Sequence, residues 1–179
     1  GTSRNPRFTF GTDINGQAVL LPYYDQIDQT GLDLQATAGS WLWKLEVISR
    51  NSQFESYNAL TAGFEYTQNG IFKSKKDLGY LVEFLYDDRN DPRVTPFERD
   101  VFLGLRLAFN DVQSTEVLTG VIIDDDSDER SYFLELSRRL GKSFKLSVEA
   151  RIISNPEATS LLYSVRRDNH IQLQLVRYF

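Results

Sequence analysis

Apolar and polar residues alternate along most of this 179-residue chain. In the segment 144–152, FKLSVEARI, every second residue from Phe144 to Ile152 is apolar, and the residues between them are Lys145, Ser147, Glu149 and Arg151. Successive side chains of a strand point to opposite faces, so this period of two predicts strands with one apolar and one polar face. The pattern recurs at 32–38, 41–47, 60–66, 78–86, 101–109, 117–123 and 132–140. We therefore predict an all-β fold.

The spacing of these segments predicts about ten antiparallel strands, with eight or twelve as the alternatives. Eight strands begin from about residue 40 onward, one covers about 30–38, and at least one precedes residue 24. Asn15-Gly16 is a strong hairpin signal, so residues 1–24 form either a first strand or a hairpin. No linker divides the chain, and we expect a single domain over residues 1–179. A second interpretation takes the whole segment 1–179 as the C-terminal part of a longer barrel.

Composition removes several classes of protein. No residue is a cysteine, which excludes disulfides, zinc-thiolate sites and cysteine nucleophiles. The net charge of −5 argues against nucleic-acid binding, which needs a basic surface. No run approaches the roughly 18 to 20 apolar residues of a membrane-spanning helix. The sequence contains no phosphate-binding glycine loop and no metal-ligand motif, so we expect neither a cofactor nor a metal.

Alternation alone fits two architectures. A soluble sandwich or a lipocalin-like barrel that binds an apolar ligand turns its apolar face inward, whereas a membrane barrel turns it toward lipid. Long polar loops that alternate with mostly shorter turns favour the membrane barrel, as do aromatic residues toward the strand ends. These aromatic residues are Trp41, Trp43, Phe64, Tyr66, Tyr80, Phe84, Tyr86, Phe109 and Tyr132.

The last segment, IQLQLVRYF at 171–179, resembles the C-terminal signal of bacterial outer-membrane β-barrel proteins. Its alternating apolar positions are matched by Ile171, Leu173, Leu175 and Phe179. Arg177 departs from the pattern, because the family usually has an aromatic or apolar residue there. The resemblance implies a transmembrane, antiparallel up-and-down β-barrel in the bacterial outer membrane. Its partners would be the lipid bilayer, lipopolysaccharide and the outer-membrane assembly machinery.

On this interpretation the polar face lines a narrow lumen. A barrel of about eight strands is just filled by side chains, so the charges there form either a structural ion-pair network or a narrow pore for small polar or ionic solutes. We expect a small channel, transport or structural barrel. The lumen-lining residues would be seven acids and five bases: Asp33, Glu46, Glu65, Glu83, Glu116, Glu135, Glu149, Lys44, Arg106, Arg139, Lys145 and Arg151.

An outer-membrane enzyme acting on envelope lipid is the alternative function. The single histidine, His170, follows Asp168, and Ser160 and Ser164 precede it. Nothing in the sequence pairs these groups, and we predict no enzymatic activity. The acidic loop 124–129 could bind Ca²⁺, although it lacks the spacing of an EF-hand; a solvated surface loop is the preferred interpretation.

Overall fold

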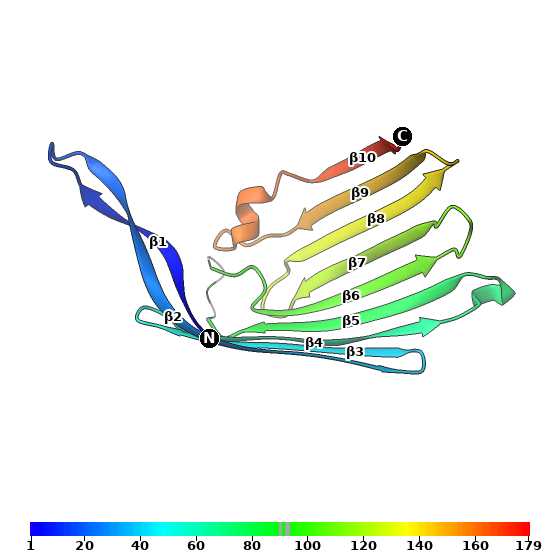
Figure 1. Ribbon diagram of the computed structural model, residues 1–179, viewed down its shortest axis with the longest axis horizontal. Coiled ribbons are helices and arrows are strands. Elements are labelled where there is room, and N and C mark those ends of the chain that lie inside the picture. Colours follow the sequence, from blue (N-terminus) through cyan, green and yellow to red (C-terminus); the bar gives the residue numbers. More distant parts are fainter. Residues whose placement is uncertain (90, 92–93) are drawn as a thin grey trace.

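The chain folds as one antiparallel sheet of ten strands in the computed structural model, which describes residues 1–89, 91 and 94–179. Each strand pairs with the next in chain order, which confirms an all-β, up-and-down arrangement (Figure 1). The strands are β1 (Thr2–Thr12), β2 (Ala18–Ala38), β3 (Trp41–Ser52), β4 (Ser56–Gln68), β5 (Asp77–Asp87), β6 (Arg99–Ala108), β7 (Glu116–Asp124), β8 (Arg130–Leu140), β9 (Phe144–Ser154) and β10 (His170–Arg177). Two short 3-10 helices, η1 (Ile71–Lys73) and η2 (Leu161–Val165), lie in connections.

The connections gather at two ends of the sheet. The turn end holds 39–40, 69–76, 109–115 and 141–143, and the loop end holds 53–55, 88–98, 125–129 and 155–169. The two longest connections, 88–98 and 155–169, are both at the loop end. The polar loops expected from the sequence therefore lie on one side of the molecule.

The first strands differ from the sequence-based expectation. Residues 18–38 form one long strand, β2, rather than separate strands before residue 24 and at 30–38. Its first half pairs with β1 and its second half with β3. The Asn15-Gly16 turn joins β1 to β2, with Gly16 at φ 79° and the Asp13 carboxylate accepting the N–H groups of Asn15 and Gln17 at 2.8 Å. The β1–β2 hairpin consequently projects beyond the loop end (Figure 1).

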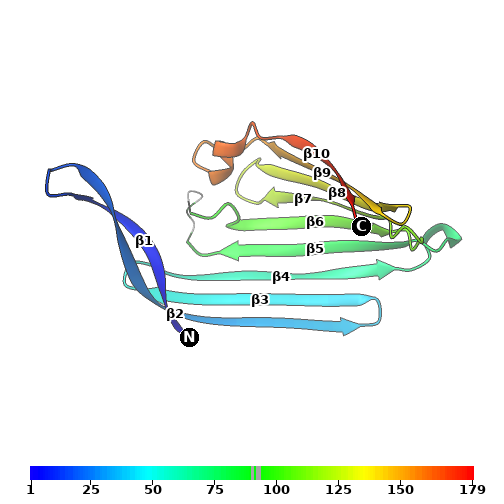
Figure 2. The ribbon, with the colours of Figure 1, turned by 45° about the horizontal axis from the view of Figure 1, so that its top comes forward.

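The sheet is curved but not closed into a barrel (Figure 2). One free edge is β10. The other includes residues 29–38 of β2, which pair with β3 and follow residues 18–28, the part of β2 that is in register with β1. Both edges run from the loop end to the turn end, because β2 and β10 are separated by an even number of antiparallel steps. They therefore cannot pair with each other in an antiparallel ladder, and the closed barrel expected from the sequence is not formed.

The two faces of the sheet differ in chemistry. The pairing register aligns the apolar positions of neighbouring strands on the same side of the sheet. For example, Trp43 is opposite Phe64, which is opposite Val82. This apolar face is not covered, since Leu34 is 51% exposed, Trp43 49% and Leu173 69%. In the described part of the chain only Ile27, Ile71 and Leu81 are buried hydrophobic residues. No helix among those residues is long and apolar enough to cross a membrane.

Candidate functional site: the charged face of the sheet

The opposite face, called here the charged face, carries all twelve charged residues that the sequence assigned to a lumen. The register places them there on β2 to β9: Asp33, Lys44, Glu46, Glu65, Glu83, Arg106, Glu116, Glu135, Arg139, Lys145, Glu149 and Arg151. Most of their side-chain partners lie on other strands, so the sequence alone could not identify them.

The Lys44 ammonium on β3 reaches the Glu83 carboxylate on β5 at 3.3 Å, across the intervening strand β4. Gly63 of β4 is the residue opposite both of them. A Cβ atom at Gly63 would lie 2.3 Å from the Val82 carbonyl oxygen and 2.6 Å from Glu83 Cγ. Because Gly63 has no side chain, the Lys44 ammonium can reach the Glu83 carboxylate over β4.

A second ion pair crosses β5 in the same manner. The Arg106 guanidinium on β6 contacts the Glu65 carboxylate on β4 at 2.5 Å. Gly79 of β5 is opposite Arg106, and a Cβ atom there would lie 2.9 Å from Glu65 Oε1. Glu65 is buried, 7% exposed, so the carboxylate end of the pair is shielded from water, whereas the Arg106 side chain is 44% exposed.

Aromatic rings repeat this arrangement farther along the sheet. Phe102 on β6 and Phe133 on β8 stack with their centroids 5.5 Å apart. Gly120 of β7 lies between them, and a Cβ atom there would be 2.5 Å from Phe102 Cε2. Three glycines thus permit contacts between strands that are not hydrogen-bonded neighbours, which makes this face crowded at these three positions.

The other charged residues in the middle of the charged face differ in their contacts, because some form ion pairs and others do not. The Arg151 guanidinium bonds both Glu135, at 3.0 Å, and Glu149, at 2.8 Å. Asp33 and Glu46 lie directly opposite each other on β2 and β3, a like-charge pair that is unfavourable. Among the described contacts neither of these two carboxylates has an ion pair.

Acidic side chains gather at the loop end of the charged face. Asp100 and Asp124 are cross-strand neighbours on β6 and β7, with Glu98 and Glu129 next to the strand ends. Asp100 is 3% exposed, and one oxygen each of Asp100 and Glu98 is buried without a hydrogen-bond partner. Burial, together with the nearby Asp124, raises the pKa of Glu98; burial is also the main cause of the raised pKa of Glu129. The sequence indicated only the 124–129 loop, because Glu98 and Asp100 come close to that loop only through the pairing of β6 with β7.

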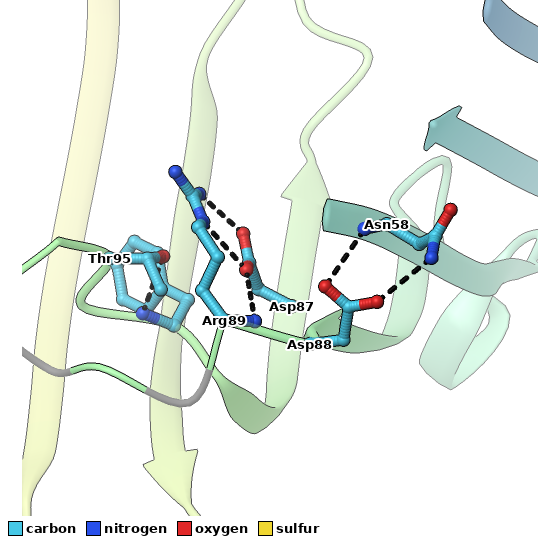
Figure 3. Close-up of polar contacts among 6 residues, drawn as sticks. Asn58, Asp87, Asp88, Arg89 and Thr95 are labelled. Atoms are coloured by element: carbon cyan, nitrogen blue, oxygen red, sulfur yellow. Dashed lines mark hydrogen bonds and ion pairs between the residues drawn. The ribbon is translucent and has the colours of Figure 1, made fainter. Parts of the chain in front are cut away.

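Acidic side chains at the loop end also have local polar partners, and Figure 3 shows those of Asp87 and Asp88. The Arg89 guanidinium binds the Asp87 carboxylate and stacks over the Tyr57 ring. The Asp88 carboxylate accepts the backbone and side-chain N–H groups of Asn58 at 2.9 and 2.8 Å. The Glu129 carboxylate accepts the Glu157 N–H and the Ser160 hydroxyl, both at 3.3 Å, and so ties the 125–129 connection to 155–169.

The C-terminal strand carries three of the four residues that the sequence assigned to an assembly signal. The register places Ile171, Leu173 and Leu175 on the apolar face, opposite Ala150, Val148 and Leu146 of β9. Phe179 lies beyond the strand end and is fully exposed.

Arg177, which departs from the signal, shares the apolar face. Its guanidinium is 5.7 Å from the centre of the Phe144 ring and 4.7 Å from that of Phe179. These cation–π contacts place the charge at the turn end, beside aromatic rings.

His170 has no catalytic arrangement with the nearby serines in the described hydrogen bonds. Its Nδ1 lies 2.8 Å from the Asp168 carbonyl oxygen, whereas the Ser164 hydroxyl donates to the Leu161 carbonyl oxygen. Ser160 bonds Glu129 instead. Across all the residues that the structure describes, no three acidic, histidine or cysteine side chains are arranged to hold a metal ion.

Comparison with known proteins found no matching family model and no significant match among curated proteins or solved structures.

Proposed function

We propose that the protein is a bacterial outer-membrane β-barrel protein whose apolar face contacts lipid and whose charged face lines a narrow lumen for small polar or ionic solutes. The observation that carries this proposal is the exposure of an aromatic-rich apolar face on a sheet that has almost no buried core. Contiguous apolar surface of this extent marks a binding partner or a membrane. A bilayer would cover it on every strand at once.

Aromatic side chains on the apolar face support the lipid contact. Trp41, Trp43, Phe64 and Tyr66 form one cluster near the turn end, with centroids 4.7 to 5.6 Å apart. The Tyr80 ring extends this cluster from β5. Tryptophan and tyrosine favour the membrane–water interface, because their rings are apolar and their tips are polar.

The crowding of the charged face supports its inward position. Side chains converge on the concave side of a curved sheet, and the contacts across Gly63, Gly79 and Gly120 are of this kind. A lipocalin-like barrel would instead place the apolar side chains on the concave side. The soluble alternative is therefore disfavoured.

Closure of the barrel requires a further strand between the two free edges. Residues 29–38 of β2 and the strand β10 run in the same direction, so a strand that is antiparallel to both completes the ladder. Asp33 faces this gap on the charged side, and a cation on the closing strand would offset its repulsion with Glu46. The strand β1 has the required direction but pairs farther along β2.

The lipid assignment is tested by solubility and by gel migration. The folded protein should need detergent to stay monomeric, and its migration on a gel should change on heating. A folded monomer that is soluble without detergent would contradict the proposal.

The lumen assignment is tested in planar bilayers. Purified protein should give discrete conductance steps that change in Glu83→Gln and Arg106→Gln, because each substitution leaves a charge of the lumen without its partner. The matched control is Asp28→Asn, which lies at the base of the projecting hairpin. Silence across salts and voltages would indicate a filled lumen and leave a structural role.

A further inference from the structure

A polar hollow of about 430 Å³ lies at the turn end of the charged face. Most of its lining comes from polar residues of β7, β8, β9 and the connections beside them: Ser114, Glu116, Ser137, Arg139, Lys142 and Lys145. Phe144 and Tyr178 complete the lining. Three cations thus face one carboxylate. The volume is within the range of about 300 to 1,000 Å³ that small-molecule sites occupy.

The cations of this hollow are held together by the fold. Arg139 on β8 and Lys145 on β9 are directly opposite each other in the ladder, and Lys142 lies in the turn that joins these strands. Like charges in this position are destabilising. The backbone N–H of Arg139 also donates to the Gln113 carbonyl oxygen at 2.9 Å, which draws the 109–115 connection to the hollow.

These cations differ from three other cations of the charged face. Lys44, Arg106 and Arg151 each bind a carboxylate. By contrast, the described contacts give the side chains of Arg139, Lys142 and Lys145 no ion pair and no hydrogen bond. The hollow therefore has a surplus of positive charge and several unused N–H donors.

We infer that this hollow binds a small phosphate-bearing anion. A phosphate group carries up to two negative charges and three acceptor oxygens, which suits a site with a net positive charge and with donors on two strands and a turn. The Arg139 guanidinium can bind two of the oxygens in parallel, and the lysines act as point charges. The Ser114 and Ser137 hydroxyl groups add two neutral donors.

The location distinguishes a free solute from a lipid headgroup. All three cations line the charged face or its edge, whereas lipid would contact the opposite face, to which Phe144 alone of the lining belongs. The ligand is therefore a diffusible phosphate compound. This inference deepens the proposed lumen function by naming a class of solute, although binding in the hollow does not require an open lumen.

The test is a titration of the full chain in zwitterionic detergent with glycerol 3-phosphate, followed by calorimetry and phosphorus NMR. Wild type should show saturable binding, and the double substitution Arg139→Gln, Lys145→Gln should weaken it about tenfold or more, since hydrogen bonds to charged groups contribute more than neutral ones. Lys75→Gln is the matched control: it removes one charge at the turn end outside the hollow and should leave the affinity unchanged.

Three results would overturn the inference: no saturable binding by wild type, equal binding by the double variant, or equal weakening by Lys75→Gln. Vesicles with and without phosphatidylglycerol supply the second arm, and binding to such vesicles without binding of glycerol 3-phosphate would show a lipid site instead. Gel migration before and after heating checks that the variants fold. Phosphate binding by a protein that gives no conductance would leave this inference intact and contradict only the open lumen.

Discussion

Single glycines decide which charges meet on the charged face. Lys44 and Glu83 are 39 residues apart in sequence and two strands apart in the sheet, yet their charged groups are 3.3 Å apart. The contact exists because Gly63 between them has no side chain. The same condition holds at Gly79 for the pair of Arg106 and Glu65.

Substitution of Gly63 by valine should lower the free energy of unfolding by about 1–3 kcal/mol, the usual cost of overpacking. The new side chain would push against the Val82 backbone as well as Glu83, so the strain cannot be relieved by side-chain rotation alone. Urea unfolding in detergent provides the measurement. Gly31→Ala is the control, because the nearest atom to its Cβ would be 3.7 Å away; equal effects of the two changes would refute this explanation.

Asp100 is a buried acidic residue whose carboxylate the fold satisfies only in part. It is buried beside Asp124, and its Oδ2 has no hydrogen-bond partner. Asp100→Asn should therefore raise stability at pH 8 by about 1 kcal/mol, the scale of one unsatisfied buried group. Asp126→Asn, at an exposed aspartate, should change it by less than about 0.5 kcal/mol. A loss of stability in Asp100→Asn would indicate that the carboxylate has a partner that it requires.

At the scale of elements, the loop-end connections should respond to pH. Because the pKa values of Glu98 and Glu129 are raised in the folded chain, the folded state binds these protons more tightly than the unfolded state. The contribution of these two glutamates to the free energy of unfolding is therefore constant below the ordinary glutamate pKa of 4.5. It falls as the pH rises from there to the raised pKa values, and it stays low at higher pH.

Amide exchange in the 125–129 and 155–169 connections, corrected for the intrinsic effect of pH, should accordingly show more protection at pH 5 than at pH 8. Glu129→Gln should reduce this difference, because it removes a titrating group while keeping an acceptor for Glu157 and Ser160. An unchanged pH response in this variant would assign the effect to other groups.

The projecting hairpin is the element with the least support. β1 pairs only with β2, and nearly all its residues are exposed. A two-stranded hairpin alone is marginally stable in water. Amides of residues 2–12 should thus exchange roughly tenfold or more faster than those of 59–67, which lie between two strands. Comparable protection of both segments would mean that another surface covers the hairpin.

At the scale of the whole molecule, the two tryptophans report on the environment of the apolar face. Trp41 and Trp43 are the only tryptophans of the chain, and both lie on that face. Lipids with brominated acyl chains should strongly quench their fluorescence, and aqueous iodide should quench it weakly. Trp41→Phe assigns the signal to Trp43. Strong iodide quenching with no effect of the brominated lipids would contradict the lipid contact.

The pattern of alternation predicted most of the strands, because the side on which a residue lies depends only on its parity along the strand. It could not predict that residues 18–38 form one strand, since polar residues between 25 and 30 interrupt the apolar parity. Nor could it predict the contact of Asp100 with the acidic loop, or that Arg139 and Lys145 have no ion pair among the described contacts. These depend on register, which is set by the pairing of whole strands.

By itself the sequence determined that the chain is all-β, that its strands number about ten, and which residues share a face. These properties are local, because they follow from the period of two and from turn residues such as Asn15-Gly16. Only the tertiary structure decided which charges are paired, where charge of one sign accumulates, and that both free edges run in the same direction. Those properties depend on distances between residues that are remote in the chain, and pairing of complete strands brings such residues together.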